Sequence, residues 1–381
     1  MADAAVAGAA GSGAAPGGRL ASRGLIVLAG LAAVLAVALL AGARYGLLLA
    51  LGLGFGLVLE GLRFGFAGPW RAMILRRDPS GILAQLLAIA LVSVVAFPLL
   101  ARAGGEIQGA AAPIGWAMAG GAFVFGAAMQ VVLGCGSGTL VNAGSGNPVS
   151  LLALPFFAIG SFLGAYSLVW WTGLGALPVL TLTGGSGLAL TLVLLAAVAG
   201  LLLLLAAPGT RRVPRRLVIA ALLLAALAVG NLVVAGQPWG VVYGLGLWGA
   251  KAAVALGADL SGSAFWTAPG NAARLEASLL TDVTSLTNIG IICGAFLVSC
   301  WRQGGLSQPL PKLPARAWAA TVVTGLLLGY SSRLAFGCNV GAFFSGISTG
   351  SLHGWVWFAM AFAGSVIGVR LRPALGLEAR T

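Results

Sequence analysis

The sequence predicts an all-α integral membrane protein. Three observations carry this prediction. Of the 381 residues, 60% are hydrophobic and only 8% are charged, whereas soluble domains carry about 25% charged residues. The chain also holds 60 glycines, and small residues let transmembrane helices approach closely while glycine permits backbone outside a helix. We therefore expect about nine membrane-crossing helices together with short re-entrant helices.

The apolar stretches follow one another with few interruptions. Residues 1–22 are rich in alanine and glycine, which favours a disordered tail. The stretches that can cross a bilayer or dip into it are 24–43, 46–62, 81–101, 114–133, 149–171, 187–207, 217–235, 239–257, 284–301, 317–334 and 353–369. If every one of them crosses, the cationic loops cannot all lie on one side of the membrane.

The cationic loops decide which stretches cross. These loops are 71–77, 211–216, 302–316 and 370–380. If 46–70 and 239–270 are re-entrant, all the cationic loops become cytoplasmic, as the positive-inside rule requires. The N-terminus then lies outside and the C-terminus inside. The net charge of +13 follows from this topology and does not indicate nucleic-acid binding.

One motif occurs twice. The first copy reads GAAMQVVLGCGSGTLVNAGSGNP (126–148) and the second reads GYSSRLAFGCNVGAFFSGISTGS (329–351). At a shift of 203 positions (338 − 135), Cys338 aligns with Cys135 and Gly337 with Gly134. Duplicated broken helices indicate a substrate site near the middle of a transporter. Because an odd number of crossings separates the copies, we expect inverted repeats.

The chain is therefore expected to consist of six successive parts. These are a tail (1–22), a first transmembrane helix (23–45), a first repeat (46–171), linking transmembrane helices (172–238), a second repeat (239–372) and a cytoplasmic tail (373–381).

Three motifs of the second half carry a resemblance to a known family. They are WGAKAAVALGADLSG (248–262), DVTSLTNIGIICGAF (282–296) and GLLLGYSSRLAFGCNVGAFFSGISTGSLHGWVWF (325–358). From residue 46 to about 375 the chain resembles the YeeE/YedE family of bacterial sulfur-transport membrane proteins. The resemblance implies thiosulfate uptake across the inner membrane. It also implies that cysteines pass thiosulfate along through sulfur–sulfur hydrogen bonds, a role that maps onto Cys135 and Cys338.

The chain departs from the family pattern at one position. The segment RFGFAGPWR (63–71) resembles the first re-entrant motif of the family, in which a cysteine usually follows the aromatic residue. Gly65 stands in its place, so a third thiol is missing there. One hypothesis is that Cys293 supplies a replacement from a neighbouring helix.

The thiols and the glycines beside them suit a soft, doubly charged anion. A neutral thiol is a weak donor and acceptor with a polarizable sulfur, whereas a thiolate would repel thiosulfate. Glycines 134, 136 and 337 allow backbone N–H groups to line a cavity, and Asn339 can donate to oxygens. The alternative is that the cysteines are small apolar fillers and that polar side chains only satisfy backbone freed at the break. The recurrence of the thiol in both halves favours the functional interpretation.

Arg333 and Lys251 are charges within apolar stretches, and charge at membrane depth indicates a functional site. Both can attract a dianion. The alternative for Arg333 is an interfacial anchor or a clamp on carbonyl groups. Glu60 and Asp282 are candidates to carry a coupling proton, or they pair with a neighbouring cation.

No metal site, cofactor or catalytic activity is expected. The four cysteines show no CxxC or Cys/His spacing, the chain has one histidine, and transport requires no covalent step. Two alternatives stay open. The same fold can carry a selenium compound or another small anion, or a membrane sulfur carrier can pass a persulfide to a cytoplasmic sulfur-transfer protein. The expected partners are thus thiosulfate or a related anion, the lipid bilayer and such an acceptor protein.

Overall fold

The computed structural model describes residues 16–303 and 310–378, and every regular element in these ranges is a helix. The first half contains α1 (Pro16–Ala41), α2 (Ala43–Gly61), α3 (Ala67–Arg76), α4 (Ser80–Arg102), α5 (Trp116–Val132), α6 (Gly136–Gly144), α7 (Pro148–Tyr166) and α8 (Leu168–Thr172). The second half contains α9 (Gly184–Leu205), α10 (Arg215–Ala235), α11 (Val242–Ala255), α12 (Pro269–Glu276), η1 (Leu279–Thr281), α13 (Val283–Gln303), α14 (Ala315–Leu334), η2 (Asn339–Phe344), α15 (Ser345–Ser348) and α16 (His353–Ala374).

Ten helices of the described ranges are long and apolar enough to cross a membrane, one more than expected. The additional one is α2, a single helix of 19 residues where the sequence analysis expected a re-entrant segment over 46–70. The glycines that suggested a break serve close packing instead, since a Cβ on Gly52 would lie 2.6 Å from the Thr287 carbonyl oxygen of α13. Two shorter helices, α3 with 10 residues and α11 with 14, are not among the candidate spans.

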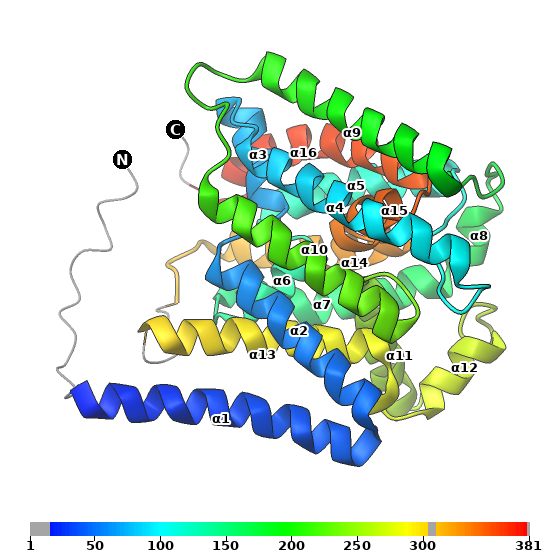
Figure 1. The fold of residues 1–381 in the computed structure, drawn as a ribbon. Coiled ribbons are helices and arrows are strands. Elements are labelled where there is room, and N and C mark those ends of the chain that lie inside the picture. Colours follow the sequence, from blue (N-terminus) through cyan, green and yellow to red (C-terminus); the bar gives the residue numbers. More distant parts are fainter. Residues whose placement is uncertain (1–15, 304–309, 379–381) are drawn as a thin grey trace.

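The helix arrangement also changes the expected position of the N-terminal helix. α1 and α2 form a hairpin that turns at Gly42, whose φ is 115°. The first residues of α1 and the last residues of α16 consequently lie at the same end of the molecule (Figure 1). The expectation of termini on opposite sides of the membrane rested on nine crossings, whereas ten crossings would place the two termini on the same side.

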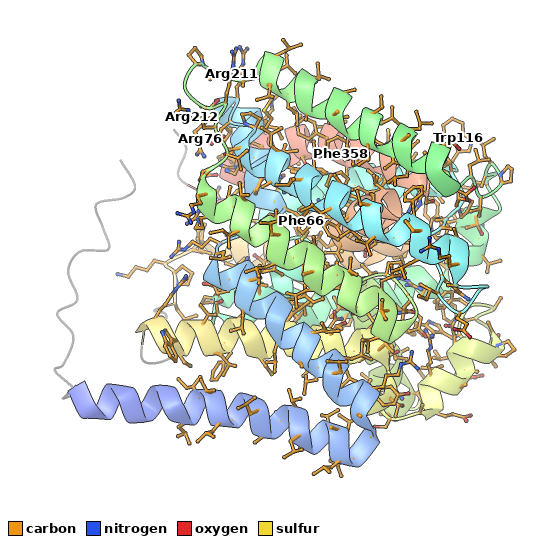
Figure 2. The ribbon with its side chains drawn as sticks, viewed as in Figure 1. Phe66, Arg76, Trp116, Arg211, Arg212 and Phe358 are labelled. Atoms are coloured by element: carbon orange, nitrogen blue, oxygen red, sulfur yellow. The ribbon has the colours of Figure 1, made fainter. Side chains whose placement is uncertain are left out.

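One end of the molecule carries the cationic loops. Figure 2 shows Arg76, Arg211 and Arg212 at this end and Trp116 at the opposite end. We call the former the cationic end and the latter the opposite end. α12 lies at the opposite end (Figure 1).

The motif glycines place the long helices of the two halves in direct contact. α5 packs against α16, and α7 packs against α14, which are among the largest helix contacts of the fold. A Cβ on Gly126 of α5 would overlap the Ala361 carbonyl oxygen of α16, and a Cβ on Gly329 of α14 would overlap the Phe157 carbonyl oxygen of α7. Gly126 and Gly329 are equivalent positions of the two motifs, so the duplicated glycines make equivalent close crossings.

Replacing Gly126 by alanine is expected to destabilise the fold by about 1–3 kcal/mol, because the added methyl group has no space at this crossing. The measurement is the apparent unfolding temperature of the purified protein in detergent, followed by tryptophan fluorescence. Gly120→Ala, on the same helix, is the matched control, since its Cβ would meet no atom within 4 Å. Equal unfolding temperatures for the two variants would contradict the close crossing.

Candidate functional site

The first helix break lies between α5 and α6 and is built around Cys135. Leu133 adopts a left-handed conformation (φ 54°) that ends α5. Cys135 then caps α6: its sulfur accepts from the Gly138 N–H at 3.4 Å, and its carbonyl accepts from the Thr139 hydroxyl at 2.8 Å. A Cβ on Gly134 would lie 2.8 Å from the Thr139 hydroxyl oxygen, so only glycine fits there without a shift. The chain thus stops and restarts a helix within three residues.

The second break, between α14 and η2, repeats this geometry. Phe336, the counterpart of Leu133, is also left-handed (φ 56°). Cys338 has backbone angles of −93° and −167°, close to the −78° and −168° of Cys135. The Gly337 carbonyl, which follows the left-handed residue, accepts from the Trp357 indole N–H at 3.1 Å. The two cysteines therefore occupy the same local conformation.

The two breaks meet inside the protein. A Cβ built on Gly136, the first residue of α6, would lie only 2.8 Å from the Cys338 sulfur. Cys135 is 1% exposed and Cys338 0% exposed, and both are free thiols. Gly136 and Cys338, which are 202 positions apart in the chain (338 − 136), are thus neighbours in the fold.

Cys135 borders an open cavity of about 390 Å³. Exposed Arg63 and Gly68 lie on its rim, so the cavity opens at the end of α2. Glu60 lies at the same rim, 3.5 Å from Arg302 in a salt bridge. The residues lining the cavity are Leu59, Glu60, Arg63–Gly68, Leu133–Cys135, Ser137, Gly138, Val141, Asn142, Ser145 and Asn147. Cys338 does not line this cavity, and its sulfur instead lies against Gly136.

Gly65, the position at which the family resemblance implies a cysteine, lies in this cavity. Its carbonyl accepts from the Gln85 amide at 2.9 Å. A Cβ on Gly65 would meet no atom within 4 Å. The position therefore has room for a thiol beside Cys135, although this chain carries none.

Replacing Gly65 by cysteine is expected to leave the unfolding temperature within about one degree of the wild type, since the side chain enters open space. The new thiol should react with a water-soluble maleimide faster than either Cys135 or Cys338, as labelling followed by peptide mass spectrometry would measure. Gly134→Cys is the contrasting variant, because its Cβ would clash with Thr139. A Gly65→Cys protein that resists labelling or unfolds early would contradict the open cavity.

Asn339 is the expected donor that keeps its polar atoms free. It is 0% exposed, and neither its amide nitrogen nor its amide oxygen has a hydrogen-bond partner among the described residues. A buried amide without partners is costly, by about 1–3 kcal/mol for each unsatisfied group. The hydroxyls near the breaks are instead occupied: Thr139, Ser145 and Ser345 donate to the carbonyls of Cys135, Val141 and Trp239.

The remaining candidates lie away from the Cys135 cavity. Cys293 is exposed on α13 and does not line it. The Lys251 ammonium group donates to the Leu275 and Ala277 carbonyls at 2.5 and 2.6 Å, at the end of α12. Arg333 lies over the Phe265 ring, 4.7 Å from its centroid. Asp282 accepts from the Ser285 N–H at 2.7 Å and caps α13.

Sequence reasoning missed a pair of buried amides that hold the segments beside the breaks. Gln85 donates to the Gly65 carbonyl, and Asn288 donates to the Val241 carbonyl, each at 2.9 Å. The two residues are separated by the same 203 positions (288 − 85) as the cysteines. An amide within an apolar stretch, repeated at the motif shift, is the signal that identifies them.

The described residues hold no group of three or more His, Cys, Asp or Glu side chains that could bind a metal ion. The cavity chemistry available in these ranges is therefore that of a thiol, backbone amides, Asn142, Glu60 and Arg63. Apart from the Glu60 carboxylate, this set offers hydrogen-bond donors to the cavity.

The sequence profile of the family described as sulphur transport matches residues 62–367. The chain belongs to the sulphur transport family. This match confirms the resemblance drawn from the motifs and covers both breaks. Together with the long apolar helices, it identifies a multi-pass membrane protein of a transport family.

Two kinds of curated relatives are similar to this sulphur transport protein. The thiosulfate transporter TsuA of Spirochaeta thermophila is 27% identical over 336 residues, which cover 81% of this chain and 93% of that protein. The probable transporter YedE of Escherichia coli is 38% identical over 98 residues, and YedE of Salmonella typhimurium matches equally. The chain spans 24% of the length of these two YedE proteins.

Proposed function

We propose that this protein imports thiosulfate, or a closely related small sulfur-containing anion, and that Cys338 and Cys135 contact the anion in succession. The observation that carries the proposal is the contact between two helix breaks that each hold a buried free thiol, one of which borders an open cavity. A relative that covers most of the chain is named a thiosulfate transporter, which supports the same substrate class.

The chemistry of the site suits transfer without a deep energy minimum. Neutral thiols donate and accept only weakly, and their polarizable sulfur matches the terminal sulfur of thiosulfate. The N–H groups at the start of α6 and the unpartnered amide of Asn339 supply donors for the anion oxygens. Because conduction needs binding that is weak enough to release, weak donors in series are preferable to a single strong cationic site.

We further propose that the protein lies in the bacterial inner membrane with its cationic end in the cytoplasm, following the positive-inside rule. The C-terminal residues and the start of α1 would then both face the cytoplasm, and the Cys135 cavity would open inward. The halves that contain the two breaks would form inverted repeats around the site. A cytoplasmic sulfur-transfer protein would dock at the cationic end.

Uptake of radiolabelled thiosulfate into vesicles that contain the purified protein tests this proposal. We expect uptake above that of empty vesicles, inhibited by unlabelled thiosulfate more strongly than by sulfate or selenite. Uptake equal to that of empty vesicles would contradict the proposal. Stronger inhibition by selenite would instead favour the selenium alternative, for which the missing thiol at Gly65 is the specific observation.

A further inference from the structure

Two arginines at the opposite end of the molecule converge on one tyrosine. Arg274 of α12 and Arg333 of α14 place their guanidinium carbons 4.9 and 5.6 Å from the centroid of the Tyr243 ring. Arg333 also lies over Phe265, 4.7 Å from that ring centroid. Arg274 is exposed and Arg333 is partly buried, so the pair leads from the surface inward.

Neither arginine has a carboxylate partner in the part of the chain that the structure describes. The ion pairs among the described residues involve Arg71, Arg302 and Arg372 only. The buried Nε of Arg333 has no hydrogen-bond partner in the same part of the chain. One oxygen of the Asp282 carboxylate accepts from the Ser285 N–H, and the other, Oδ1, is buried with no partner among the described residues. Ring contacts alone do not compensate a cation at membrane depth, which normally pairs with an anion or with carbonyl groups.

The position equivalent to Arg333 in the first half carries a neutral side chain that binds backbone. Gln130, which aligns with Arg333 at the shift of 203 (333 − 130), donates its amide to the Ala67 carbonyl at 3.0 Å. Among the described residues Arg333 makes no such bond to backbone, and its Nε has no partner, as is also true of the Gln130 amide oxygen. The second half therefore carries a positive charge where the first half carries a neutral amide that binds backbone.

The surrounding residues hold the aromatic groups and α12 in place. The Tyr243 hydroxyl donates to the Asn271 amide oxygen at 2.9 Å, and the Asn271 amide nitrogen donates to the Phe265 carbonyl at 2.9 Å. Lys251 binds the carbonyls at the end of α12 and so positions the helix that carries Arg274. An arginine that lies over an aromatic ring keeps the edge of its planar fork free for the oxygens of an oxyanion.

We infer that Arg274 and Arg333, arranged around Tyr243, form a capture site for a divalent tetrahedral oxyanion at the end of the molecule opposite the Cys135 cavity. The inference rests on the proposed function, because the captured ion is the transported anion before it reaches Cys338. Arg333 precedes Cys338 by five residues (338 − 333), so the site lies at the start of the second break. The Cys135 cavity then serves the release of the anion.

Equilibrium binding of radiolabelled thiosulfate to the full-length protein in detergent tests the inference. We expect Arg333→Gln and Arg274→Gln each to weaken binding about ten- to hundredfold, because each removes a charge-assisted contact. Arg333→Gln introduces the side chain that the first half already uses at this position. Arg333→Lys keeps the charge but loses the planar fork, and should bind with intermediate affinity. Arg102→Gln is the matched control, an exposed arginine at the C-terminal end of α4.

The outcomes separate the capture site from the proposed function. A Cys135→Ala/Cys338→Ala protein should lose uptake into vesicles, and the thiosulfate binding that remains should still weaken when Arg274→Gln is added. Binding that is unchanged in Arg274→Gln and in Arg333→Lys would overturn the capture site, even if Arg333→Gln fails to fold. If the wild type takes up no thiosulfate while binding still depends on both arginines, the capture site stands and the proposed import fails.

Discussion

Alanine at Cys135 or at Cys338 is expected to reduce thiosulfate uptake at least about tenfold, and in combination to abolish it. Each substitution removes a weak donor at a position where the anion has left bulk water, and a lost buried hydrogen bond costs about 1–3 kcal/mol. Both side chains are buried, so no other side chain can replace them without a rearrangement of the breaks. The measurement is the initial rate of radiolabelled thiosulfate uptake into vesicles with equal amounts of inserted protein.

The chain provides its own controls for this experiment. Cys293 is exposed and Cys300 is partly buried, and both lie on α13 outside the Cys135 cavity. Cys293→Ala and Cys300→Ala should therefore transport at rates close to the wild type. If all four alanine variants behave alike, Cys135 and Cys338 are packing residues and the thiol mechanism is wrong. If Cys293→Ala fails instead, the hypothesis that Cys293 replaces the thiol missing at Gly65 gains support.

Gly136→Ala is expected to have the second largest effect, because its methyl group would occupy the contact between the two breaks. The added Cβ would lie 2.8 Å from the Cys338 sulfur and 3.3 Å from the Val241 side chain. Overpacking of this kind costs about 1–3 kcal/mol and displaces the side chain it meets. We expect both a lower unfolding temperature and a loss of uptake of about tenfold or more.

A double variant separates the two effects of Gly136→Ala. In Gly136→Ala/Cys338→Ala the colliding sulfur is gone, so the unfolding temperature should recover towards that of Cys338→Ala while uptake stays low. Gly138→Ala should be milder than Gly136→Ala, since its Cβ would meet the Cys135 sulfur at an ordinary 3.6 Å. Additive losses of stability in the double variant would contradict direct contact between Gly136 and Cys338.

Composition and the motif repeat predicted most of the architecture. Few charges and long apolar stretches are sufficient for a membrane-embedded helical fold, because a helix satisfies its own backbone in lipid. The breaks at Cys135 and Cys338 were also predictable, since glycines interrupt the apolar pattern there. The sequence analysis expected a re-entrant segment over 46–70, whereas α2 is one continuous helix long enough to cross a membrane. The difference arises because glycine has two uses that a sequence does not distinguish. It breaks a helix at Gly337, whose φ is 152°, and it permits close helix contact at Gly52.

The sequence by itself determined that the protein is helical, lies in a membrane and carries two equivalent cysteine breaks, since these properties depend on composition and local pattern. Only the tertiary structure decided which residues meet. It brings Gly136 against Cys338 and leaves Cys293 exposed, it uses Lys251 to hold α12, and it sets Arg333 beside Arg274. Such contacts join residues far apart in the chain, and they follow from how glycine-lined helices pack, which no local pattern encodes.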